Sequence, residues 1–170
     1  LPGSLQVNIM PLTAVDGGAR WRLAGAGDWR LPGYIETGLI PGDNLVYQVE
    51  YVEDYRPFAE AFWKDAVRRG FRCVYFRFTE HPTLVPDGTD GVEIVRLDPA
   101  AGVEVFLSRI NSTVDCLGPG TCFVFDCLSD LAEAWYSDQM LANFFKLTCP
   151  HVLDVHSLAY FAILRNNHSQ

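Results

Sequence analysis

Short apolar runs that alternate with segments of helical spacing constrain the fold of this chain most strongly. The apolar runs are residues 44–50, 72–78, 92–97, 121–126 and 151–155. The segments with apolar residues at helical spacing are residues 55–69, 100–115, 129–147 and 157–166. Strands that alternate with helices form a mostly parallel sheet with helices on both faces. The pattern therefore predicts a three-layer α/β/α domain over residues 44–170.

Glycine and proline are frequent in the first 43 residues, as in "LPGSLQVNIMP" and "LPGYIETGLIPGD". Both residue types interrupt regular structure and favour turns. We therefore expect residues 1–43 to form an irregular N-terminal segment, with short strands at 5–10 and 19–23. The chain begins at Leu1 and runs to "NNHSQ" just past the last expected helix. From these ends we expect a fragment of a longer protein.

Charge and composition argue against several classes of protein. The chain has 21 acidic and 13 basic residues and a net charge of −8, so it lacks the basic face that non-specific nucleic-acid binding needs. No run approaches the roughly 18 apolar residues that span a membrane. The five cysteines are odd in number and include no C-x-x-C pair. This disfavours a disulfide framework and a zinc site, and reduced thiols fit a cytoplasmic protein.

Acidic residues stand where two of the expected strands end. In a parallel sheet the carboxyl ends of the strands share one edge, and ligands bind there. Asp126 ends the run "CFVFD", the place where P-loop NTPases hold Mg²⁺; alternatively, Asp126 or Ser129 caps the next helix. Glu80 follows the run at 72–78, where a carboxylate could orient an attacking water, or it is a solvated loop residue. His81 beside it is a candidate ligand or acid/base.

The order of several motifs resembles the RecA-type ATPase core of the KaiC family. The entry "IPG" at 40–42, the helix end "RRG" at 68–70, the acidic strand end at Glu80 and the strand "FVFD" at 123–126 follow one another as in that family. The resemblance covers about residues 38–155. It implies a RecA-like sheet that binds ATP and Mg²⁺, with Glu80 as the catalytic carboxylate and Asp126 as the magnesium ligand.

The phosphate-binding segment departs from that family. Its G-x-x-x-x-G-K-[ST] loop should fall near 49–57, where this chain has "VEYVEDYRP". This segment lacks the glycines that let the backbone approach phosphate. It also lacks the lysine and the metal-binding hydroxyl of the motif. Three acids there would repel a triphosphate, and Arg56 and Lys64 are the weak candidates for cofactor binding. We expect an inactive site to be collapsed or filled by Tyr51 or Tyr55, and an active one to be an open pocket with basic groups pointing inward.

Several stretches, among them "YFRFTEH" and "NFFKLTCP", also resemble a narrower group. These are degenerate RecA-like segments at the head of large bacterial proteins related to phosphoenolpyruvate synthase and pyruvate, phosphate dikinase. The resemblance implies a catalytically inactive regulatory, scaffold or interaction module, with no cofactor and with other domains of the same chain as partners. RecA-like proteins often assemble, so a homo-oligomer is also expected. The alternative is an ATPase or phosphotransferase domain with an atypical phosphate site.

The resemblance makes one topological prediction. In the RecA-type sheet, the strand after the magnesium-binding strand inserts between that strand and the first one. We therefore expect the run at 151–155 to lie between the strands at 44–50 and 121–126. Direct pairing of 44–50 with 121–126 would contradict the assignment.

Overall fold

The computed structural model describes residues 6–9, 42 and 44–164 of the chain. The short strand expected at 5–10 is present as β1 (Gln6–Ile9). The strand expected at 19–23 lies outside the described residues. No described helix is long and apolar enough to cross a bilayer.

The described strands form one sheet in the order β1-β2-β6-β5-β3-β4. Five of them run parallel, and β1 joins the edge antiparallel to β2. This confirms the predicted α/β class with a mostly parallel sheet. The parallel strands are β2 (Asn44–Val49), β3 (Arg72–Arg77), β4 (Val92–Arg96), β5 (Thr121–Cys127) and β6 (Leu158–Leu164).

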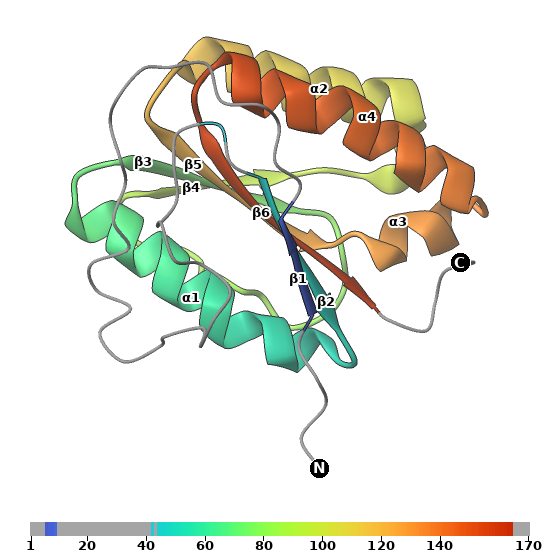
Figure 1. Cartoon of the computed structure of the whole chain (residues 1–170), viewed down its shortest axis with the longest axis horizontal. Helices are drawn as coiled ribbons and strands as arrows, with labels where there is room; N and C mark the ends of the chain where they lie inside the picture. The colour runs from blue at the N-terminus through green and yellow to red at the C-terminus, as the bar shows by residue number, and fades with distance from the viewer. Residues whose placement is uncertain (1–5, 10–41, 43, 165–170) are drawn as a thin grey trace.

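Helices cover both faces of this sheet, as a three-layer arrangement requires (Figure 1). Of the described helices, α1 packs against one face, whereas α2 and α4 lie side by side over the other. A short helix, α3, follows β5 directly. The helices are α1 (Val52–Arg68), the 3-10 turn η1 (Pro99–Ala101), α2 (Val103–Leu117), α3 (Ser129–Ala134) and α4 (Asp138–Asp154).

The central strands are apolar throughout because both of their faces are buried. Side chains along a strand alternate between the two faces. In β2, Leu45 and Tyr47 face α1 while Val46 faces the α2–α4 layer. In β5, all seven residues are buried. The sequence pattern predicted these strands because no polar alternation interrupts them.

The C-terminal part of the chain contradicts two predictions. Residues 151–155, predicted as a strand, belong almost entirely to the end of α4, and residues 157–166, predicted as a helix, contain β6. Pro150 lies inside α4, where it removes only one backbone donor from the helix. Short apolar runs do not distinguish a buried strand from a helix turn by periodicity, and both segments are such runs.

The inserted strand is nevertheless present at the predicted place in the sheet. β6 lies between β2 and β5, so these two strands do not pair directly. The residues that fill this place are 158–164 rather than 151–155. The helix predicted over 129–147 is also divided, into α3 and α4, at Tyr136, whose φ is +52°.

Candidate functional site

The connection between β2 and α1 is too short for a phosphate loop. β2 ends at Val49 and α1 begins at Val52, so only Glu50 and Tyr51 link them. The motif G-x-x-x-x-G-K-[ST] is itself about eight residues long and needs glycines to cradle phosphate. The chain therefore passes from strand to helix at this edge without forming a backbone cradle.

The first turn of α1 contains two acids, and one of them accepts a hydrogen bond from the N–H of the residue before the helix. Asp54 accepts a hydrogen bond from the Tyr51 backbone N–H at 3.3 Å, and its own N–H donates to the Tyr51 carbonyl at 3.1 Å. Glu53 lies in the same turn. Carboxylates are stabilised at a helix N-terminus by the helix dipole. An incoming anion would meet these negative charges, so the helix start repels phosphate.

Tyr55 fills the space beneath this turn. Its side chain is fully buried and its ring centroid lies 5.5 Å from that of Tyr47. Tyr51, the other residue predicted to fill an inactive site, is 66% exposed. Burial raises the pKa of the Tyr55 hydroxyl well above its ordinary value, so this group stays neutral. Aromatic packing thus occupies the interior next to the β2–α1 turn.

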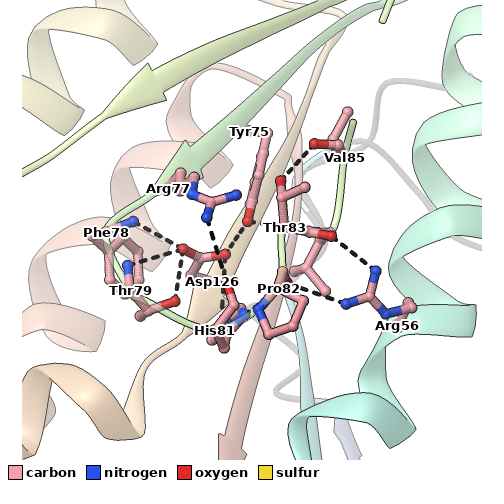
Figure 2. A network of polar contacts seen from close by, with 11 residues as sticks. Arg56, Tyr75, Arg77, Phe78, Thr79, His81, Pro82, Thr83, Val85 and Asp126 are labelled. Atoms are coloured by element: carbon pink, nitrogen blue, oxygen red, sulfur yellow. Dashed lines mark hydrogen bonds and ion pairs between the residues drawn. The ribbon is translucent and has the colours of Figure 1, made fainter. Parts of the chain in front are cut away.

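Asp126 is completely buried at the carboxyl end of β5 and is surrounded by hydrogen-bond donors (Figure 2). Its Oδ2 accepts from the backbone N–H groups of Phe78 and Thr79, at 2.9 and 3.2 Å, and from Thr79 Oγ1 at 3.0 Å. Its Oδ1 accepts from the Tyr75 hydroxyl. The carboxylate therefore binds the segment that follows β3.

His81 is a further polar neighbour of Asp126. Its Nε2 lies 3.7 Å from Asp126 Oδ1, and its Nδ1 lies 3.0 Å from the Pro82 carbonyl oxygen. A carbonyl only accepts, so Nδ1 carries the proton in that contact. Asp130 of α3 is nearby: burial raises the pKa of its carboxyl group, His81 lowers it, and Asp126 and Glu133 raise it.

The two predicted cofactor-binding bases are engaged elsewhere. Arg56 donates to the carbonyl oxygens of Thr83 and Pro82, at 2.8 and 3.1 Å, and so fastens α1 to the same segment. Lys64 pairs with Glu60 at 3.1 Å and lies 5.5 Å from the Trp63 ring centroid. It is about 18 Å along α1 from the helix start at 1.5 Å per residue. Lys64 is therefore not part of the Asp126 cluster.

The predicted site residues are only partly brought together. Asp126, Arg56 and Glu80 all lie at or beside the segment after β3, and Glu80 is exposed there between Thr79 and His81. Sequence analysis did not identify Tyr75 and Thr79 as partners of Asp126. Tyr75 lies opposite Val124 in the paired strands, two positions before Asp126. That neighbour relation becomes visible only once β3 and β5 are known to pair.

The surroundings of Asp126 do not fit a resident Mg²⁺. Magnesium is bound by oxygen atoms that accept, commonly with several waters. The neighbours of this carboxylate are N–H and O–H groups that donate to it, and both of its oxygens already have such partners. Among residues 6–9, 42 and 44–164, no cluster of three or more His, Cys, Asp or Glu side chains is arranged to hold a metal ion.

A comparison with known protein families finds no family model that matches this chain, and a comparison with curated proteins finds no significant match.

Proposed function

We propose that this chain is a RecA/KaiC-like domain that does not bind nucleotide through a phosphate cradle. It acts as a regulatory, scaffold or interaction module of a larger protein related to phosphoenolpyruvate synthase and pyruvate, phosphate dikinase. The observation that carries the proposal is the two-residue connection of Glu50 and Tyr51 between β2 and α1. A phosphate loop depends on backbone N–H groups that converge on phosphate, and this connection has no length for them.

Two further observations support the proposal. The strand order β2-β6-β5-β3 has a strand inserted between the first strand and the strand that ends in Asp126, which is the order that the RecA resemblance predicts. The residues that a nucleotide would need are engaged with the protein itself: Asp126 binds Phe78 and Thr79, and Arg56 binds backbone carbonyls. A nucleotide would have to displace these contacts before it could use either residue.

Calorimetric titration of the purified domain with ATP and Mg²⁺ tests the absence of nucleotide binding. ADP with Mg²⁺ and phosphoenolpyruvate serve as the second and third ligands. We expect no saturable heat up to millimolar ligand. The β2–α1 connection has no backbone cradle for phosphate, and the acids Glu53 and Asp54 would repel the phosphate groups of the ligand.

The opposite result would support the alternative function, an ATPase or phosphotransferase domain with an atypical phosphate site. That result would be a saturable heat of ATP binding at micromolar ATP in the wild-type chain, and its loss in Glu80→Ala. Glu104→Ala is the matched control, since Glu104 is an exposed carboxylate in the first turn of α2. Loss of binding in both variants would indicate a general charge effect rather than a site at Glu80.

The interaction role is tested on the same protein by its assembly state. Sedimentation velocity over a hundredfold range of concentration separates a monomer from the homo-oligomer that the resemblance to RecA-like proteins implies. A monomer at all concentrations leaves other domains of a longer chain as the proposed partners. A concentration-dependent oligomer would instead make the second copy the first partner to map.

A further inference from the structure

We propose that residues 78–86, here called the strap, form a carboxylate-binding loop whose ligand is Asp126 of the same chain. In this arrangement Asp126 is a latch that holds the strap closed over the α1-facing side of the sheet. The inference departs from the magnesium role predicted for Asp126, and it does not depend on whether the domain binds nucleotide.

The donors of the strap have the chemistry of an anion site. Two consecutive backbone N–H groups, those of Phe78 and Thr79, point at one carboxylate oxygen, and the Thr79 hydroxyl joins them (Figure 2). Successive N–H groups that converge in this way form anion-binding concavities. The Tyr75 hydroxyl holds the other oxygen. The carboxylate they bind is fully buried, so it is a ligand of the strap rather than a solvated side chain.

The strap takes the place of a helix in the fold. The connection from β3 to β4, residues 78–91, contains no helix, yet it must cross over the sheet because the two strands are parallel neighbours. Leu84 and Val85 are buried against the α1-facing core. The Leu84 N–H donates to the Tyr75 hydroxyl at 3.3 Å, so the same tyrosine contacts both the latch and the buried part of the strap.

Side chains of different chemistry attach the strap to the rest of the fold. Asp126 holds its start, and Arg56 holds its middle through the carbonyl oxygens of Pro82 and Thr83. Arg77 donates to the His81 carbonyl at 3.4 Å, which gives a third, longer contact. The only one of these attachments that consists of a buried anion is Asp126. Consequently a cation at Asp126 and the closed strap compete for the same carboxylate oxygens.

Amide hydrogen exchange of the intact chain tests the latch. In Asp126→Ala we expect exchange at the Phe78 and Thr79 amides to become at least about tenfold faster, because a hydrogen bond to a charged acceptor is lost. Amides inside β3 such as that of Val74 should change little. Asp87→Ala is the control, since Asp87 is an exposed carboxylate paired with Arg96 and should leave both amides unchanged.

Chemical rescue then identifies the ligand class. Added formate should restore slow exchange at Phe78 and Thr79 in Asp126→Ala, because it can occupy the space of the missing carboxylate. It should have no effect on the wild-type chain, and sodium chloride at equal ionic strength should not substitute for it. Accelerated exchange without formate rescue would overturn the carboxylate-binding loop and leave Asp126 as a general packing residue.

Two milder variants keep the test decisive if Asp126→Ala does not fold. Asp126→Asn keeps the shape of the side chain but removes its charge, and Thr79→Val removes one donor without touching the carboxylate. Both should accelerate exchange at Phe78, by less than Asp126→Ala would. Unchanged exchange in both variants would overturn the proposal. So would saturable Mg²⁺ binding to the wild-type chain that accelerates exchange at these amides, since it would make Asp126 a cation ligand.

Discussion

At the scale of single residues, the chemistry of Asp126 is decided by its neighbours. A carboxylate at the carboxyl end of a buried strand can hold a metal ion when acceptors and waters complete the coordination. In this chain the Asp126 carboxylate is instead surrounded by hydrogen-bond donors, namely the Tyr75 hydroxyl and the N–H groups after β3. Position in the sequence predicted a functional carboxylate at this edge. The type of partner that Asp126 has could not be predicted, because it depends on the path of the loop that follows β3.

Tyr55 offers a test of an uncompensated buried hydroxyl. Within the part of the chain that the structure describes, this hydroxyl has no hydrogen-bond partner, although its side chain is fully buried. A buried polar group without a partner costs free energy, so Tyr55→Phe should leave the free energy of unfolding unchanged or raise it by about 1 kcal/mol. Urea denaturation of the two proteins measures this difference.

Tyr47 provides the matched control for that change. Its hydroxyl hydrogen-bonds that of Tyr160, and both rings are buried on the same side of the sheet. Tyr47→Phe should lower the free energy of unfolding by about 1 kcal/mol, because it leaves Tyr160 without its partner. A larger loss in Tyr55→Phe than in Tyr47→Phe would show that the Tyr55 hydroxyl does have a stabilising partner.

The thiols should differ sharply in reactivity. Burial raises the pKa of Cys122 to about 12, of Cys149 to about 12 and of Cys127 to about 11, so thiolate is scarce in these groups at pH 8. Cys73 is also buried, with its pKa raised still further, whereas Cys116 is exposed. A disulfide reagent at pH 8 should modify one thiol rapidly in the native chain. It should modify no thiol rapidly in Cys116→Ser, whereas in urea it should modify all accessible thiols. A second rapidly modified thiol in the native chain would contradict the buried arrangement.

At the scale of elements, two helices end on residues that usually avoid the backbone conformation found there. Tyr136 follows α3 and His156 follows α4 with φ of +52° in both cases. Each helix closes in the same way, with the Ser157 N–H bonded to the Val152 carbonyl after α4 and the Ser137 N–H to the Ala132 carbonyl after α3. Glycine is the usual residue at this position, since it has no Cβ to strain the left-handed conformation.

His156→Gly should therefore stabilise the protein. His156 is exposed, so the change removes backbone strain without removing a buried contact. We expect the free energy of unfolding to rise by about 0.5–1 kcal/mol, the strain relieved being partly offset by the greater freedom of glycine in the unfolded chain. Thermal unfolding of His156→Gly measures the gain. His156→Ala, which keeps the strain, should show none; an equal gain in His156→Ala would assign the effect to the imidazole instead.

The same helix end explains why the C-terminal elements were predicted wrongly. Apolar residues stand on both sides of His156, as in Val152–Leu153 and Leu158–Ala159, and no glycine marks where the helix stops. His156 takes the role of that glycine, so the usual stop signal is absent. The strands from β2 to β5 were predicted correctly because turn residues or charged residues bound each of them. Element type was thus predictable where the boundaries were marked.

At the scale of the whole molecule, the two faces of the sheet are covered by different means. Among the residues that the structure describes, α2 and α4 share one face and α1 is the one long helix on the other (Figure 1). Leu84 and Val85 of the strap complete the layer of α1. Alternation of strands and helices predicted three layers correctly. It could not predict the strap as a covering element, because Leu84 and Val85 stand among prolines and polar residues that are typical of a solvated loop.

Net charge leads to the last prediction, which concerns the stability of the molecule as a whole. The chain carries a charge of −8, and its exposed ion pairs, such as Lys64–Glu60 and Arg96–Asp87, contribute little individually. Repulsion among the acids should therefore outweigh these pairs, and salt should screen it. Raising sodium chloride from low to roughly physiological ionic strength should increase Tm by about 3 °C, or on the order of 1 kcal/mol.

Glu50→Gln combined with Glu53→Gln should reduce that increase, because both acids are exposed beside the start of α1. A Tm that falls as salt is added would mean that attractive ion pairs, rather than the excess of acids, dominate the electrostatic free energy of the fold.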